Sequence, residues 1–350
     1  MFDCSYTGNN PPSDNLVQAL TRYLGQESVT YASGGELCGA SAPAPGVVAA
    51  AVSAAEQADA VVITIGNDGS NLAGRVAPPP SRVNTSLESL GGCLENEGTD
   101  RVSIAVPQLQ LRLLSAVLNA TQATAAASDG KGKPVIVVVF SGGPVDLTPL
   151  KEAAGVSAIL WAGFPAAAGG SAIAATIFGD NAPAGRLTQT FYNEKFLLEV
   201  PITNMAMRPG AGPNGSSSSP GRGYRFYTGE NVVYPFGFGL TYSTFSLLSL
   251  SADAGSANVS VANTGGTATA YTTLLFIAPP LAAGGPAAGH PRRLLASYRK
   301  EHYAVGEQKS LVLPFSPRAL ELAQVDGSLA RTPGVWTAAV EELNVSFTVS

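Results

Sequence analysis

The stretch Pro134-Val135-Ile136-Val137-Val138-Val139-Phe140-Ser141-Gly142-Gly143-Pro144 carries the strongest strand signal in the chain. Six apolar residues follow one another without a polar break and end at a Ser-Gly-Gly-Pro turn. Such a run predicts a strand buried on both faces, because a half-exposed strand alternates apolar and polar residues. The turn lacks the Lys-Ser/Thr of a phosphate-binding P-loop, and Pro144 removes a backbone donor, so we interpret it as a structural turn.

Further apolar runs on both sides of this stretch extend the pattern. Strands are predicted at Ala60–Gly66, Ala158–Trp161 and Leu187–Tyr192, with a short first strand at Ser28–Tyr31. Helices are predicted between them by apolar spacing or by composition, at Asn15–Leu24, Val47–Ala55, Leu109–Asn119 and Gly169–Phe178. Apolar strands that alternate with helices predict a mostly parallel sheet covered by helices, an α/β sandwich.

The composition changes beyond about residue 208. Residues 209–223 are mostly Pro, Gly and Ser. In residues 224–240 aromatic residues lie between glycines, and these aromatic side chains could stack on sugars or form the core of a domain junction. Short alternating segments then recur at 257–263, 271–277, 294–298, 309–315, 334–340 and 344–349. They predict an all-β sandwich of the immunoglobulin or fibronectin type III kind. The expected division is 1–208, a connector at 209–244, and 245–350.

Charge and hydropathy exclude several kinds of partner. The 350 residues have a formal net charge of −5 and no clustered Lys and Arg, so we expect no nucleic-acid partner. No apolar run approaches the roughly 18 residues of a membrane span, and the first residues show no export signal. Asn-x-Ser/Thr triplets begin at Asn84, Asn119, Asn214, Asn258 and Asn344 and give weak support for export.

The supply of metal and thiol ligands is small. Cys4, Cys38 and Cys93 are too few and too scattered for a zinc site. The spacing is compatible with two alternatives. One is a Cys4–Cys38 disulfide with Cys93 unpaired, and the other is three buried thiols. His290 and His302 both lie in the C-terminal part, which excludes a Ser-His-Asp triad or a His-ligated metal in the first two thirds of the chain. We expect no cofactor and no metal.

One stretch concentrates acidic residues in a chain where only 13% of residues are charged, against roughly 25% in an ordinary domain. Leu94-Glu95-Asn96-Glu97-Gly98-Thr99-Asp100-Arg101 holds three acids and an arginine. Carboxylates suit glycosidic-bond cleavage, because one protonates the leaving oxygen while a second attacks the anomeric carbon or activates water. Glu95 and Glu97 are two residues apart, so in an extended loop they point to the same side and cannot flank a sugar. One could act as the acid while the other, or Asp100, pairs with Arg101; a solvated loop is the alternative.

Eight segments, in the same order, resemble glycoside hydrolase family 3 in its β-xylosidase/α-arabinofuranosidase branch. The string Glu95–Arg101 (ENEGTDR) resembles the E-x-E-G-x-D-R element of that family. The other segments are Ala58–Asp68, Pro134–Asp146, Ala158–Gly170, Gly185–Tyr192, Val200–Pro209, Pro220–Tyr227 and Tyr234–Phe245. The likeness covers nearly the whole chain.

The resemblance implies a fold and a division of catalytic labour. Residues up to about 210 would form the second, α/β sandwich domain of the family, and the last hundred or so its fibronectin type III-like domain. The family is retaining, with an aspartate nucleophile on an N-terminal (β/α)8 barrel that the sequence lacks and a glutamate acid/base on the sandwich. The acid/base maps onto the acidic stretch, at Glu95 in preference to Glu97. The implied substrate is a xylo- or arabino-configured oligosaccharide, and the implied location is extracellular or the cell wall.

Two features depart from the family pattern. Roughly 25 residues, 69–93, separate the G-x-D segment from the acidic element, where the family has only a few. The family's L-P-G-x-Q is altered to Val106-Pro107-Gln108-Leu109-Gln110. Because a retaining mechanism also needs a nucleophile, the alternative function is a non-catalytic module that binds carbohydrate or a partner subunit.

Overall fold

The computed structural model describes residues 14–34, 45–67, 101, 103–126, 132–211 and 218–350. They form two compact units. The α/β unit consists of Met1–Phe178 with Phe191–Lys195, and the β unit consists of Gly179–Thr190 with Phe196–Ser350. The domain boundaries expected at residues 208 and 244 stay predictions.

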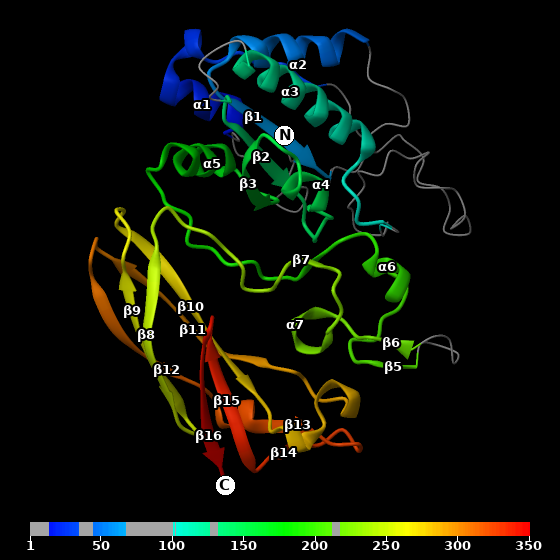
Figure 1. Cartoon of the computed structure of the whole chain (residues 1–350), viewed down its shortest axis with the longest axis vertical. Helices are drawn as coiled ribbons and strands as arrows, with labels where there is room; N and C mark the ends of the chain where they lie inside the picture. The colour runs from blue at the N-terminus through cyan, green and yellow to red at the C-terminus, as the bar shows by residue number, and fades with distance from the viewer. Residues whose placement is uncertain (1–13, 35–44, 68–100, 102, 127–131, 212–217) are drawn as a thin grey trace. The chain divides into compact units, whose positions relative to one another are not determined.

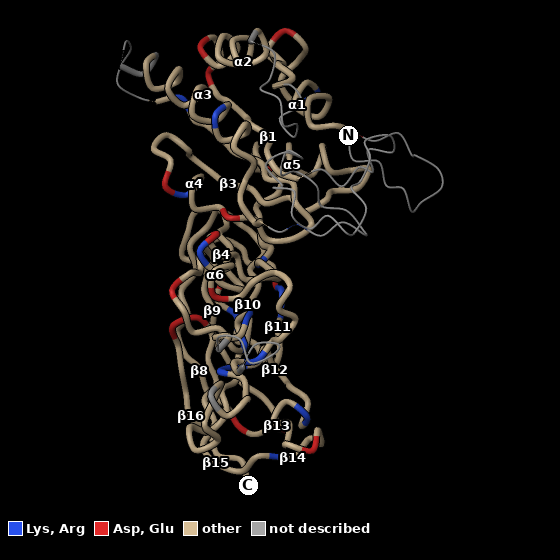
Figure 2. The backbone as a smooth tube through the Cα atoms, turned by 90° about the vertical axis from the view of Figure 1, so that its right-hand side faces the viewer, with Lys and Arg blue, Asp and Glu red and all other residues tan. Residues whose placement is uncertain are grey.

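A three-stranded parallel sheet forms the centre of the α/β unit (Figure 1). Its strands are β1 (Val61–Gly66), β2 (Val135–Phe140) and β3 (Val156–Gly163), in the order β1-β2-β3. The other elements are α1 (Leu16–Leu24), a 3-10 helix (Gln26–Ser28), α2 (Pro45–Gln57), α3 (Gln108–Ala126), α4 (Thr148–Lys151), α5 (Gly169–Phe178) and β4 (Phe191–Tyr192). Helix α3 lies on one side of the strands, and α1 and α5 lie on the other (Figure 2).

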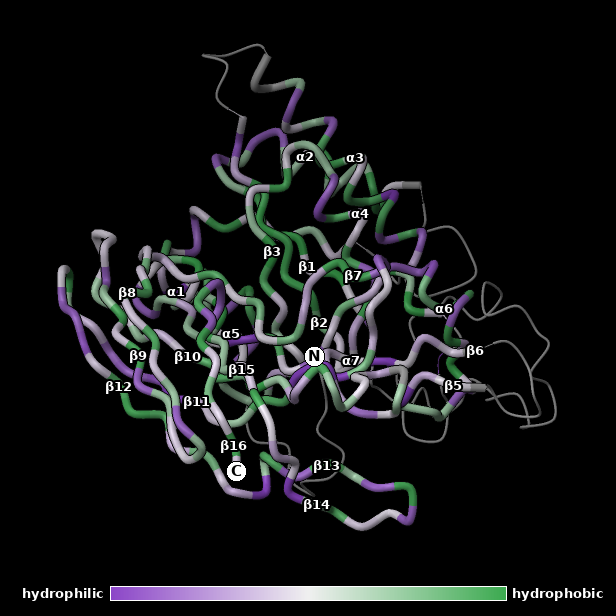
Figure 3. Tube along the Cα trace, turned by 60° about the horizontal axis from the view of Figure 1, so that its bottom comes forward, coloured by the Kyte–Doolittle hydropathy of each residue, from purple (hydrophilic) through white to green (hydrophobic). Residues whose placement is uncertain are grey.

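The central strand β2 is buried, as its unbroken apolar sequence predicts. Val135, Val137, Val138 and Val139 are all fully buried, and the three strands are among the most hydrophobic parts of the tube in Figure 3. The partners of β2 on both sides are parallel, with Ile63 opposite Val137 and Val137 opposite Ile159. The predicted α/β class and its parallel sheet are therefore confirmed.

Two of the predicted strands need correction. No strand forms at Ser28–Tyr31, where the chain is irregular after the 3-10 helix. Tyr31 is 65% exposed, so its ring does not pack into a core as the ring of a buried strand would. The predicted strand Leu187–Tyr192 shortens to β4. Leu187 instead donates its N–H to the carbonyl of Phe238 and accepts from Gly237, both at 2.8 Å, within the β unit.

Two antiparallel sheets build the β unit. The first has the order β11-β10-β15-β16 and the second β12-β9-β8. Their strands are β8 (Phe245–Ala252), β9 (Ser256–Asn263), β10 (Thr269–Ala278), β11 (Leu294–Tyr303), β12 (Gln308–Pro314), β15 (Gly334–Val340) and β16 (Leu343–Val349). The smaller elements are β5 (Gly210–Ala211), β6 (Ser218–Ser219), β7 (Val232–Tyr234), β13 (Glu321–Ala323), β14 (Leu329–Arg331), α6 (Phe196–Glu199) and α7 (Gly223–Phe226). All six predicted strands are present, and the sequence pattern missed β8 and the hairpin β13–β14.

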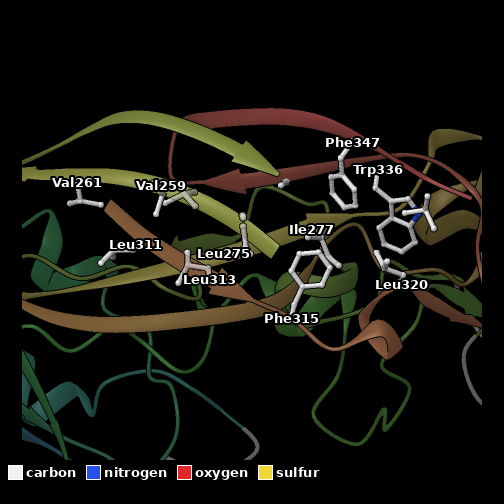
Figure 4. Packing of buried hydrophobic residues seen from close by; sticks show 14 of the residues in the cluster. Val259, Val261, Leu275, Ile277, Leu311, Leu313, Phe315, Leu320, Trp336 and Phe347 are labelled. Atoms are coloured by element: carbon white, nitrogen blue, oxygen red, sulfur yellow. The ribbon is translucent and has the colours of Figure 1, made fainter. Parts of the chain in front are cut away.

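The two sheets of the β unit share one hydrophobic core (Figure 4). Val259 and Leu313 enter it from one sheet, and Ile277, Trp336 and Phe347 enter it from the other. Trp336 is fully buried, and its indole N–H donates a hydrogen bond of 2.9 Å to the carbonyl of Thr332. An all-β part after the α/β part is therefore confirmed, while its fibronectin type III type stays a prediction.

The aromatic residues between glycines pack against one another inside the β unit. The rings of Tyr224 and Phe236 stack with their centroids 4.2 Å apart, and Phe276 on β10 meets both edge-on. The guanidinium of Arg293 covers the Phe276 ring at 4.4 Å. These contacts favour the interpretation of the segment as a packed core. In the part of the chain that the structure describes, no helix is long and apolar enough to cross a membrane.

Candidate functional site

The acidic element ends at the carboxyl end of the parallel sheet. Glu95 and Glu97 lie outside the described residues, and the described part of the element is its last residue, Arg101. The Nη1 of Arg101 donates a hydrogen bond of 3.2 Å to the carbonyl of Pro144, in the turn that follows β2. In open α/β sheets ligands bind beyond the carboxyl ends of the strands. The end of the acidic element is thus held where such folds place their sites.

The residues after Arg101 are bound to the same turn by backbone hydrogen bonds. The N–H of Asp146 donates to the carbonyl of Ile104 at 2.6 Å, and Ala105 forms a parallel bridge with Asp146. The N–H of Ile104 donates to Oε2 of Glu194 at 3.0 Å. An isolated parallel bridge and two hydrogen bonds therefore hold residues 104 and 105 against the segment that follows β2.

Asp146 organises this corner through its side chain. Its Oδ1 accepts the N–H of Thr148 and its Oδ2 accepts the N–H of Glu194, each at 2.9 Å, and the residue is only 9% exposed. Both oxygens accept hydrogen bonds from backbone N–H groups. These bonds offset the cost of burying the carboxylate. We therefore infer that Asp146 and Glu194 have a structural role and hold the turn after β2 in place.

Gln110 fastens the helix after the acidic element to the end of β1. It is 5% exposed, its Oε1 accepts the N–H of Gly66, and its Nε2 donates to the Gly66 carbonyl, both at 2.8 Å. Gly66 itself has φ 139°, and a Cβ there would lie 1.8 Å from the carbonyl oxygen of Phe140. The altered Val-Pro-Gln-Leu-Gln string thus keeps a glutamine at the position that clamps the strand end.

The end of β3 completes the frame. The indole N–H of Trp161 donates to Oγ and to the carbonyl of Ser141, at 3.0 and 3.2 Å, and its ring meets Phe191 edge-on at 5.3 Å. A Cβ on Gly142 would lie 2.8 Å from the ring of Phe164. The Ser-Gly-Gly-Pro turn is therefore packed closely by aromatic side chains, in agreement with the structural role predicted for it.

The structure brings together residues that the sequence pattern only partly indicated. The ion pair considered between Arg101 and Asp100 or one of the two glutamates involves residues outside the described ones and stays a prediction; the Nη1 of Arg101 donates to the carbonyl of Pro144. The positioning roles of Gln110, Asp146 and Glu194 were missed. Asp146 does end the quoted string Pro134–Asp146, so its place close behind the turn that follows a buried strand was the available signal. Among the described residues, no three His, Cys, Asp or Glu side chains gather to form a metal site.

Comparison with known proteins identifies the family. Residues 3–242 match the glycosyl hydrolase family 3 C-terminal domain. The chain therefore belongs to glycosyl hydrolase family 3.

The relatives include β-xylosidases from fungi and plants. A probable exo-1,4-beta-xylosidase of Aspergillus fumigatus is 35% identical over 316 residues, which cover 83% of this chain and 35% of that protein. Beta-D-xylosidase 1 of Arabidopsis thaliana is 38% identical over 212 residues, which cover 61% of this chain and 25% of that protein. The resemblance to family 3 and its β-xylosidase branch is confirmed, and the chain spans about a third of the length of the Aspergillus relative.

Solved structures agree with the sequence comparison. A family 3 exo-β-xylosidase, XlnD, in complex with a xylobiose aziridine probe, has a TM-score of 0.75 and 27% identity, and the match covers 97% of this chain and 42% of that one. A family 3 β-glucosidase of Bifidobacterium adolescentis has a TM-score of 0.69 at 24% identity, covering 96% of this chain and 45% of that one. The second likeness supports the fold alone.

Proposed function

We propose that this chain supplies the proton-donating half of a retaining exo-glycosidase that hydrolyses xylo- or arabino-configured oligosaccharides. In this proposal Glu95 is the acid/base and Glu97 is the second candidate. The relatives named as xylosidases support the substrate class. The extracellular or cell-wall location implied by the resemblance belongs to the same proposal, and the five Asn-x-Ser/Thr triplets are in line with it.

The mechanism requires a second carboxylate from another part of the protein. A retaining glycosidase places its nucleophile and its acid/base roughly 5–5.5 Å apart on opposite sides of the glycosidic bond. Glu95 and Glu97 are two residues apart in sequence and cannot take both roles if the loop is extended. The match covers 35% of the Aspergillus relative, so a barrel outside these 350 residues is the proposed source of the nucleophile.

The observation that carries the proposal is the hydrogen bond from Arg101 to Pro144. This bond anchors one end of the acidic element at the carboxyl end of the sheet. An acid/base must be held in a fixed place relative to the leaving-group oxygen, and a rigid sheet edge is a suitable support. The clamps made by Asp146 and Gln110 add to that support.

Leaving-group dependence tests the assignment in a protein restored with a family 3 barrel. Glu95→Gln is expected to lower kcat/KM about 100- to 10,000-fold for aryl xylosides with poor leaving groups, which need protonation. The loss is expected to be small for dinitrophenyl xyloside, whose leaving group needs little proton donation. Glu97→Gln is the matched control and is expected to show no such dependence. The reverse result for the two variants would assign the acid to Glu97.

A further inference from the structure

The β unit contains a cavity of about 160 Å³ that the proposed function does not use. It lies between α7, the segment at Gly289–Pro291 and the hairpin β13–β14. The labels of α7, β13 and β14 can be followed in Figure 1. An engineered cavity of about 150 Å³ holds one benzene molecule. The cavity therefore has room for a single six-membered ring.

Two arginines at the mouth of the cavity are available to a ligand. Arg208 and Arg225 are both exposed, and neither forms an ion pair with a residue that the structure describes. Arg225 donates through Nε to the hydroxyl of Tyr224 at 3.3 Å, a bond that does not involve its two terminal nitrogens. A guanidinium binds a carboxylate through two parallel hydrogen bonds, which makes arginine the preferred residue for such anions.

His290 adds a buried polar atom with no partner. Its Nδ1 is shielded from solvent and forms no hydrogen bond with any described residue. The backbone N–H of the same residue donates to the carbonyl of Gly285 at 2.9 Å, which fixes the residue in the cavity wall. Buried polar atoms in proteins are nearly always hydrogen-bonded. Because water does not reach this atom, we assign His290 to the wall of the cavity and not to the polar contacts of its ligand.

The remaining walls determine the size and charge of the ligand. Phe226 and Leu322 are 7% and 2% exposed and form an apolar surface, which suits the C–H face of a sugar ring. Glu321 also lines the cavity and is in no described ion pair. Its carboxylate can accept a hydroxyl and offsets one of the two arginines. This balance favours a ligand with one negative charge over a doubly charged phosphate.

We propose that this cavity binds a hexuronate, a single sugar ring that carries a carboxylate. The carboxylate meets Arg208 and Arg225, a ring hydroxyl meets Glu321, and the C–H face packs on Phe226. The proposal goes beyond the proposed function, because it involves neither Glu95 nor hydrolysis and rests on residues of the β unit alone.

Titration of the 350-residue chain with sodium D-glucuronate, followed by calorimetry, tests the proposal. Saturable binding with a Kd of about 1 mM is expected from a small charge-assisted site. D-glucose has the same ring without the carboxylate and is expected to bind at least 10-fold more weakly. Inorganic phosphate is expected to bind more weakly than glucuronate.

Four variants separate this site from general charge attraction. Arg208→Gln and Arg225→Gln are each expected to weaken glucuronate binding at least 10-fold, and Ala323→Leu, which fills the cavity, is expected to abolish it. Arg318→Gln changes an exposed arginine of the same unit that does not line the cavity, and it is expected to leave Kd unchanged. Unchanged melting temperatures would show that the folds are intact. Glucuronate binding that survives both arginine substitutions, tighter binding of phosphate, or no binding at tens of millimolar would overturn the proposal.

Discussion

Single side chains hold the frame behind the acidic element by satisfying backbone groups. Gln110 uses its amide oxygen and nitrogen on the N–H and carbonyl of Gly66. Asp146 uses both carboxylate oxygens on backbone N–H groups. Each residue therefore positions its neighbours by bonding to their backbone groups.

Replacement of Gln110 by leucine tests this role. Gln110→Leu leaves the N–H and carbonyl of the buried Gly66 without their partners, and each unsatisfied buried group costs about 1–3 kcal/mol. We expect the free energy of unfolding to fall by about 2 kcal/mol or more, measured by urea denaturation. Gln108→Leu, at an exposed position two residues earlier on α3, is the matched control and is expected to change it by less than about 0.5 kcal/mol. Equal effects of the two changes would contradict the role assigned to Gln110.

Helix α1 is attached to α5 by contacts that require a glycine. The N–H of Gly170 donates to the carbonyl of Asp14 at 3.1 Å, and the N–H of Asp14 donates to the carbonyl of Ala167 at 2.9 Å. The rings of Tyr23 and Phe178 stack at 4.6 Å at the far end of the same pair of helices. The sequence predicted both helices, while their contact became visible only in the structure.

Gly170→Ala is expected to weaken the contact between α1 and α5. The added Cβ would lie 2.3 Å from the carbonyl oxygen of Asp14, so the two helices have to move apart, at a cost of about 1–3 kcal/mol. Gly46→Ala, a glycine-to-alanine change in α2 with no atom within 4 Å, is expected to stabilise by about 0.5–1 kcal/mol. Thermal melts followed by circular dichroism measure both changes. A stable Gly170→Ala protein would show that the helices are not held this closely.

The same pair of helices carries a group that responds to acid. Arg22 and then Ser171, which hydrogen-bond to the Asp14 carboxylate, hold the pKa of Asp14 down to about 2 from its ordinary 3.8. A lowered pKa means that the contribution of Asp14 is complete above its unfolded pKa near 4 and is lost as the pH falls from about 4 to about 2. Asp14→Asn is therefore expected to lower the melting temperature at pH 6 and to have little effect at pH 2. An equal drop in the melting temperature of Asp14→Asn at pH 6 and at pH 2 would contradict the role assigned to the Asp14–Arg22 ion pair.

The whole chain contributes one part of a longer catalytic assembly in our proposal. The match covers 83% of this chain but 35% of the Aspergillus xylosidase. We expect the isolated 350-residue chain to release no nitrophenol from aryl β-xyloside, because a retaining mechanism cannot proceed with its acid alone. The absorbance of the released nitrophenolate measures the reaction, and the barrel-restored protein is the positive control. Robust turnover by the isolated chain, lost on Glu95→Gln, would disprove the need for a separate nucleophile.

The sequence alone determined the class of each part and the family. Unbroken apolar runs such as Val135–Phe140 and alternating runs such as Gly334–Val340 depend on local periodicity, which the chain carries in its own letters. The ordered motifs from Ala58 to Phe245 sufficed for family 3, which the comparison confirms. The assignment of Glu95 or Glu97 as the acid stays a prediction.

Only the tertiary structure decided which distant residues meet. The amide of Gln110 lies 44 positions from Gly66, and Glu194 lies 90 positions from Ile104, so no local pattern connects them. The cavity with Arg208, Arg225 and His290 likewise arises from three separate segments of the β unit. Hydrogen bonds and cavities of this kind depend on the packing of elements far apart in the chain, which periodicity and composition do not encode.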